Sequence, residues 1–172
     1  MPPVLLLAAF LLFQPPASDG LGRLRFFVGE WTGTSSGKPG QGTVRRTYEL
    51  TLNGRVLQVE NRVVYLPQEK NKNGETHDDL GLITFDRGRK RFIYRQAHSE
   101  GFVNTYVADP VESEAKTIVF ITEAIENIPA GWRARETYLI TGPDSFVERF
   151  ELAEPGNDFT PYSEAVLTRV KR

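Results

Sequence analysis

Apolar and polar residues alternate along most of the chain. From residue 21 onward, stretches rich in β-branched and aromatic residues recur roughly every 10 to 15 residues, and Gly, Pro, Asn and Asp separate them. Alternation with a period of two is typical of half-buried β-strands, and the only candidate for a helix is a short segment at 21–28. The pattern predicts about ten strands, at residues 30–37, 41–52, 55–66, 79–85, 91–98, 101–108, 117–123, 132–141, 145–153 and 162–171.

Short turn signals join several of these predicted strands. They include Asn53-Gly54, Arg87-Gly88 and the tripeptide Gly142-Pro143-Asp144. Tight turns connect antiparallel neighbours, and a meander of about ten strands exposes unpaired edges unless it closes on itself. The sequence therefore predicts an all-β fold, which is a single closed antiparallel up-and-down barrel of about ten strands with a short N-terminal helical turn.

The N-terminus carries a different pattern. Residues 4–13 read VLLLAAFLLF, and prolines and small residues follow this apolar run. Ten residues are too few to span a bilayer, but they fit the hydrophobic centre of a secretory signal peptide. We expect residues 1–18 to be a signal peptide and 19–172 to be the barrel domain of a secreted or periplasmic protein without an integral membrane span. The alternative is an apolar segment that docks on the domain.

Composition narrows the class of protein further. The 172 residues include 21 Lys and Arg against 22 Asp and Glu, so no basic excess points to a nucleic acid partner. Hydrophobic residues make up 40% and charged residues 25%, as in ordinary globular domains. The absence of Cys excludes disulfides, thiolate nucleophiles and Cys-ligated zinc. One domain is expected, and its oligomeric state stays open.

A short motif opens the domain. Residues 26–33 read FFVGEWTG, an apolar turn that runs into G-x-W-x-G, and the last predicted strand contains AVLTRV at 165–170. This combination resembles the calycin barrels, which include lipocalins, fatty-acid-binding proteins and nitrobindin-like haem barrels, and we expect a bacterial-type member of that group. The resemblance implies that Phe27, Trp31 and Arg169 form a closing cluster. Only residues 35–41 separate the first two strands, too few for a helical lid, which favours the nitrobindin-like group.

Alternation also predicts which side chains point into the barrel. On residues 41–52 the inward face carries Val44, Arg46, Tyr48, Leu50 and Leu52. Polar interior residues need partners once they leave water, and ten strands enclose more space than side chains readily fill. We therefore predict a cavity that binds a small amphipathic organic molecule. Its predicted ligand-binding residues are Arg46, Tyr48, Asn61, Tyr94, Gln96, His98, Asn104, Tyr106, Trp132, Glu136 and Glu148.

Within this set we expect a division of roles. Arg46 would meet an anionic or carbonyl group of the ligand. The polar part would be oriented by Tyr48, Tyr94, His98 and Asn104, and the apolar part would be enclosed by Phe92, Phe102, Trp132 and Phe150. The alternative is a filled, purely structural barrel in which Arg46 forms a buried ion pair with Glu136 or Glu148.

Catalytic and cofactor motifs are sparse. An enzyme would use His98 with Glu136 or Glu148 as an acid and base pair, but no nucleophile motif supports it, so binding without catalysis is favoured. The resemblance implies haem bound through one histidine near the end of the domain. No histidine follows His98, so haem would need His98 itself as the axial ligand.

One further histidine lies in a polar segment. His77 stands with Glu75, Asp78 and Asp79 after the loop 67–74. Carboxylates and an imidazole can ligate a cation, but such clusters are usually solvated loops. We predict no metal site, and we interpret residues 75–78 as loop.

Overall fold

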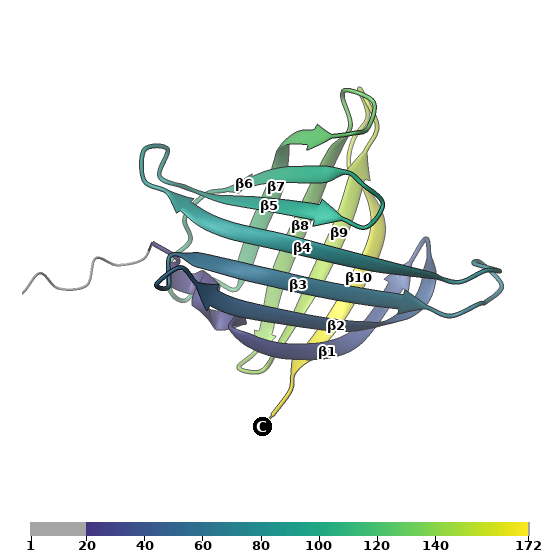
Figure 1. Cartoon of the computed structure of the whole chain (residues 1–172), viewed down its shortest axis with the longest axis horizontal. Coiled ribbons are helices and arrows are strands. Elements are labelled where there is room, and N and C mark those ends of the chain that lie inside the picture. The colour runs from purple at the N-terminus through teal and green to yellow at the C-terminus, as the bar shows by residue number, and fades with distance from the viewer. Residues whose placement is uncertain (1–19, 172) are drawn as a thin grey trace, which may run out of the picture.

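The structure, a computed structural model, describes residues 20–171 as a closed barrel of ten antiparallel strands (Figure 1). The predicted signal peptide, residues 1–18, lies outside the described residues. A single 3-10 helix, η1 (Gly22–Phe27), precedes the sheet. The strands are β1 (Gly29–Gly37), β2 (Gly40–Thr51), β3 (Val56–Tyr65), β4 (Glu75–Asp86), β5 (Arg91–His98), β6 (Val103–Ala108), β7 (Thr117–Glu126), β8 (Arg133–Gly142), β9 (Ser145–Ala153) and β10 (Thr160–Arg169). The predicted fold class is confirmed.

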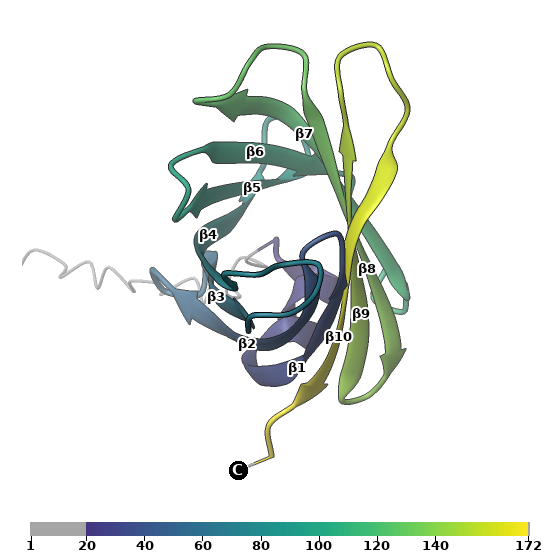
Figure 2. The same cartoon turned by 90° about the vertical axis from the view of Figure 1, so that its right-hand side faces the viewer.

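Each strand pairs with the next along the chain, and β10 returns to pair with β1 (Figure 2). Trp31 and Arg169 are opposite partners in this closing pair. A glycine makes the close approach possible, because a Cβ on Gly33 would lie 1.9 Å from the carbonyl oxygen of Val166. The second glycine of the G-x-W-x-G motif therefore lets the two ends of the sheet meet.

One end of the barrel is filled by η1 and the aromatic residues beneath it. Leu24 and Trp31 are fully buried there, and the Trp31 indole nitrogen donates to the carbonyl oxygen of Phe27 at 2.6 Å. Arg169 donates to the carbonyl oxygens of Phe26, at 2.7 Å, and Val28, at 2.5 Å. The predicted closing cluster of Phe27, Trp31 and Arg169 is confirmed.

The structure corrects the start of β4. The strand begins at Glu75 rather than Asp79, and His77 pairs with Val63 of β3. Residues 75–78 were predicted as a solvated loop because they are polar on both faces. One face of this segment meets solvent and the other meets the rim of a cavity, so no apolar alternation marks the strand.

The end of β2 is also corrected. Leu52 was predicted to point inward, but its side chain is 73% exposed. It lies in the turn after β2, where Leu52, Asn53 and Gly54 all have positive φ and the Gly54 N–H donates to the carbonyl oxygen of Thr51. The alternation ends when the backbone leaves the strand, so Leu52 turns outward.

Within residues 20–171, no helix combines the length and the apolar character needed to cross a membrane.

Candidate functional site

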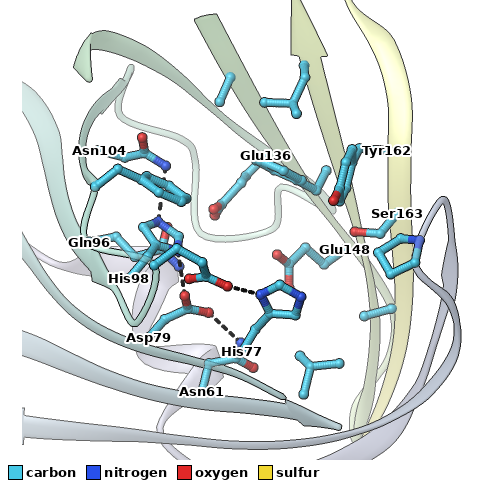
Figure 3. Close-up of a pocket in the computed structure, with 18 of the residues that line it drawn as sticks. Asn61, His77, Asp79, Gln96, His98, Asn104, Glu136, Glu148, Tyr162 and Ser163 are labelled. Atoms are coloured by element: carbon cyan, nitrogen blue, oxygen red, sulfur yellow. Dashed lines mark hydrogen bonds and ion pairs between the residues drawn. The ribbon is translucent and has the colours of Figure 1, made fainter. Parts of the chain in front are cut away.

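The end of the barrel opposite η1 contains a cavity of about 500 Å³ (Figure 3). β1 starts beside η1 and ends at this mouth, where the loops between successive strands surround the opening. Pro39, Glu100, Ile128 and Pro129 contribute from these loops. The volume lies within the range of small-molecule binding sites in proteins.

Most of the predicted ligand-binding residues line this cavity. They are Arg46, Asn61, Gln96, His98, Asn104, Trp132, Glu136 and Glu148. Phe102 and Phe150, which were predicted to enclose the apolar part of a ligand, also lie on the wall. The structure thus brings together inward-facing side chains from strands that are far apart in the sequence. Ligand binding by these residues stays a prediction.

Three predicted residues do not line the cavity. Tyr48, Tyr94 and Tyr106 are buried in the hydrophobic core, as is Phe92, which was predicted to enclose a ligand. Tyr94 and Tyr106 stack on each other, with ring centroids 5.6 Å apart. Alternation predicts the face that a side chain occupies, but not its depth along the barrel axis. These four residues therefore form the layer beneath the cavity.

The sequence analysis missed several wall residues. The polar ones are Ser35, Tyr65, His77, Asp79, Glu100, Tyr162 and Ser163. Asp79 is the most consequential of these, because it pairs in register with both Asn61 on β3 and His98 on β5. Asp79 belongs to the predicted strand 79–85, but alternation gave no clear inward face there, because the apolar residues Leu80 and Leu82 lie on the opposite, exposed face.

A continuous chain of polar contacts crosses the wall from β9 to β6. Arg46 contacts Glu148 on one side and donates from Nε to Asn61 Oδ1 at 2.9 Å on the other. Asn61 Nδ2 then donates to Asp79 Oδ2 at 2.6 Å. These contacts fix the amide orientation of Asn61, since its oxygen faces a donor and its nitrogen faces a carboxylate.

The series of polar contacts continues from Asp79 through His98. Asp79 Oδ1 lies 2.5 Å from His98 Nδ1, and Asn104 Nδ2 lies 3.1 Å from His98 Nε2. Asn104 Nδ2 also donates to the Tyr106 hydroxyl at 2.8 Å. Both ring nitrogens of His98 therefore have protein partners, and its ring stacks on Phe102 with centroids 4.0 Å apart.

The charges of Arg46 and Glu148, at the β9 end of this series of polar contacts, neutralise each other. Burial works to lower the pKa of Arg46, but the negative charge of Glu148 together with interactions with Tyr48 and Tyr138 outweighs it, and the pKa lies well above its usual range. The ion pair of Arg46 with Glu148 that was weighed as a structural alternative is present, and it borders the cavity.

Burial likewise works to raise the pKa of Asp79, but the hydrogen bonds from His98 and Asn61 together with the charges of His98 and Arg46 outweigh it, and the pKa is lowered.

Glu136 differs from the other carboxyl groups. Its side chain accepts a hydrogen bond from the Tyr138 hydroxyl at 2.5 Å, and it is 3% exposed. Burial, followed by repulsion from Glu148, raises the pKa of Glu136 to about 8. At neutral pH most of this side chain is therefore a neutral carboxylic acid on the cavity wall.

Four buried side-chain atoms on the wall form no hydrogen bond within residues 20–171. Asp79 Oδ1 and His77 Nε2 lie beside their ion-pair partners, whereas Gln96 Oε1 and Asn104 Oδ1 have neither kind of partner. A buried acceptor without a donor costs about 1 to 3 kcal/mol, so such atoms are uncommon in native proteins. They indicate a place where an occupant of the cavity would donate hydrogen bonds.

The second histidine lies at the rim. His77 Nδ1 contacts Glu100, and its Nε2 lies 3.4 Å from Glu75. Burial works to lower the pKa of His77, but the hydrogen bonds and charges of Glu100 and Glu75 outweigh it and the pKa is raised. This contact joins β4 to the β5–β6 turn across one side of the mouth.

No group of three or more His, Asp or Glu side chains in residues 20–171 is arranged to hold a metal ion. Axial ligation of haem through His98 Nε2 would displace Asn104, whereas Asp79 would keep its contact with Nδ1, as carboxylates commonly do beside ligating histidines. In the structure itself, His98 is a hydrogen-bonding residue of the cavity wall.

Comparison with solved structures finds a protein of the same architecture. The crystal structure of Rv2717c from M. tuberculosis matches with a TM-score of 0.67 and 17% sequence identity, and the match covers 88% of this chain and 98% of that chain. At this identity the likeness shows the fold alone. No family model matches the chain, and no curated protein matches it.

Proposed function

We propose that this protein is a calycin-like carrier that binds a small amphipathic organic molecule inside its barrel. The cavity of about 500 Å³ carries the proposal, because its wall combines polar side chains with apolar surface, which suits an amphipathic molecule. Trp132, Phe102 and Phe150 supply apolar surface, while Gln96 and Asn104 supply unpaired acceptors. The closing contact of Arg169 over Trp31 supports the assignment to calycin-like barrels.

Neighbouring positions on β10 provide a direct test. Ala165 lines the cavity, whereas the next residue, Val166, is 48% exposed on the outside of the barrel. Ala165→Phe should fill part of the cavity and weaken uptake of the neutral probe N-phenyl-1-naphthylamine by at least about tenfold, at a stability cost of about 1 to 3 kcal/mol. Val166→Phe adds the same ring outside and should leave uptake unchanged.

Fluorescence titration of the three proteins measures the affinity, and circular dichroism checks that each variant is folded. Equal uptake by both variants, or no uptake by the unmodified protein, would contradict binding inside the barrel. Native mass spectrometry of protein purified from its own cells would then identify any molecule that co-purifies.

The contact of Asp79 with His98 favours a second candidate, which is proton transfer on the bound molecule. A carboxylate that accepts from Nδ1 orients a histidine so that Nε2 can act as a base, and Glu136 could supply a proton as a neutral acid. Asn104 occupies Nε2, so a substrate would have to displace it. Chemical change of a co-purified molecule that His98→Gln and Glu136→Gln each abolish, with binding retained, would support this candidate.

A further inference from the structure

The charged side chains on the cavity wall form three ion pairs, and one carboxyl group has no cationic partner among them. The wall carries one Arg, two His and four carboxyl groups. The pairs are Arg46 with Glu148, His98 with Asp79, and His77 with Glu100. Glu136 is the fourth carboxyl group, and in the described structure it accepts a hydrogen bond from the hydroxyl group of Tyr138. The wall thus holds one deeply buried acid that no protein cation balances.

The two unpartnered acceptors lie near this acid. Gln96 and Asn104 are opposite partners on β5 and β6, so their side chains are neighbours on the inward face. Asn104 Nδ2 donates to the Tyr106 hydroxyl at 2.8 Å, and interaction with the same hydroxyl favours the ionised form of Glu136, so both side chains lie near Tyr106. Figure 3 shows Gln96, Asn104 and Glu136 on the same cavity wall. This part of the wall therefore offers three acceptors when Glu136 is ionised.

Building on the proposed binding function, we propose that the occupant carries a primary ammonium group that binds Glu136, Gln96 and Asn104. An ammonium has three N–H donors and no acceptor, so it can satisfy all three groups at once. The apolar part of the molecule contacts Trp132 and Phe150, which line the same cavity. The ligand class is an amphipathic primary amine.

Other head groups fit this wall less well. A carboxylate would add negative charge beside Glu136, Glu148 and Asp79, and the one Arg is already paired with Glu148. A hydroxyl has a single donor, so it would leave at least one of the buried acceptors unsatisfied. An ammonium instead replaces the missing cation and brings the missing donors.

Binding of the ammonium has a proton balance that can be measured. In the empty cavity the pKa of Glu136 is raised to about 8, so the group is mostly protonated at pH 7. A cation beside it stabilises the carboxylate and lowers that pKa. Glu136 then gives its proton to solvent, the ligand keeps its charge, and close to one proton is released for each amine bound.

Three probes with the same ten-carbon chain separate the head groups. Decylamine, 1-decanol and decanoate are each titrated into the full chain at pH 7 by isothermal calorimetry, in two buffers that differ in ionisation enthalpy. We expect decylamine to bind at least about tenfold more tightly than decanoate and to release about one proton, whereas decanol releases none. The difference in heat between the two buffers gives the proton count.

Two variants test the role of the acid. Glu136→Gln keeps the shape and the acceptor oxygen for Tyr138, and it should abolish the proton release and reduce the amine preference to within about twofold, while decanol binding persists. Glu49→Gln removes an exposed carboxylate and should behave as the unmodified protein. Binding of decanol or decanoate without preference for the amine, or amine binding without proton release, would overturn this inference and leave the proposed function standing. Failure of all three probes to bind would overturn both.

Discussion

The guanidinium carbon of Arg169 lies 4.2 Å from the ring centre of Trp31, and the two residues face each other across the strands that close the barrel. The contact joins the first strand to the last. Arg169 also donates to the carbonyl oxygens of Phe26 and Val28, and its Nε lies 3.0 Å from an oxygen of Asp144. The side chain of Arg169 therefore connects the closing strands, the residues next to η1 and the β8–β9 turn.

We expect Trp31→Ala to lower the free energy of unfolding by about 3 to 5 kcal/mol, the range for removal of a large buried aromatic ring. Arg169→Ala should cost about 1 to 3 kcal/mol, because two backbone carbonyls lose their donor. Arg62→Ala is the matched control, since its pair with Asp78 is exposed and should contribute less than about 1 kcal/mol. Urea denaturation measures all three. A near-neutral Trp31→Ala would contradict the closing role.

The buried pair of Arg46 with Glu148 predicts strong coupling. Arg46→Met leaves Glu148 without its cation in a buried setting, so we expect a loss of about 3 to 5 kcal/mol. Adding Glu148→Leu removes the stranded charge and should restore most of that stability. A double-mutant cycle by urea denaturation measures the coupling. Additive effects of the two changes would show that the pair does not hold the charges together.

Glu136 predicts how stability changes with pH. Its pKa is about 8 in the folded protein, against an ordinary value of 4.5 in the unfolded chain. Between these values the folded state holds a proton that the unfolded state releases, so stability falls as pH rises. We expect stability to fall steadily between about pH 5 and 8 and to level off above that range.

Glu136→Gln should remove this slope, because glutamine does not ionise. The raised pKa of His77 gives a loss in the same direction, so the difference between the unmodified protein and the variant is the informative quantity. Urea denaturation at several pH values measures it, with Glu49→Gln as the exposed control. Equal pH dependence in the unmodified protein and Glu136→Gln would show that Glu136 ionises normally in the barrel.

The apolar run at residues 4–13 predicts export. In its own cell the protein should be found outside the cytoplasm, with a first residue between about Ala17 and Leu21. Cell fractionation followed by mass spectrometry of the intact chain measures both the compartment and the N-terminus. A cytoplasmic pool that retains Met1 would contradict the prediction.

The sequence by itself determined most of the strands and their antiparallel order. Alternation has a period of two wherever one face of a strand is buried and the other is wet, so it marked most strands and placed Arg46, Asn61, Gln96 and Glu136 inside. The contact of Trp31 with Arg169 was expected from the resemblance of FFVGEWTG and AVLTRV to calycin barrels, and the register of β1 with β10 confirms it.

Only the tertiary structure decided how deep each inward side chain lies along the barrel axis and which charged side chains pair. Tyr48 and Arg46 share a face in the sequence, yet one lies in the core and the other borders the cavity, because position along the barrel axis depends on strand register and tilt. Whether Arg46 would pair with Glu136 or with Glu148 also depended on how distant strands curve toward each other across the barrel interior. That curvature pairs Glu148 with Arg46 and leaves Glu136 as a neutral acid. The contact of Asp79 with His98 also depends on how their strands pair. None of these contacts produces a local pattern in the sequence.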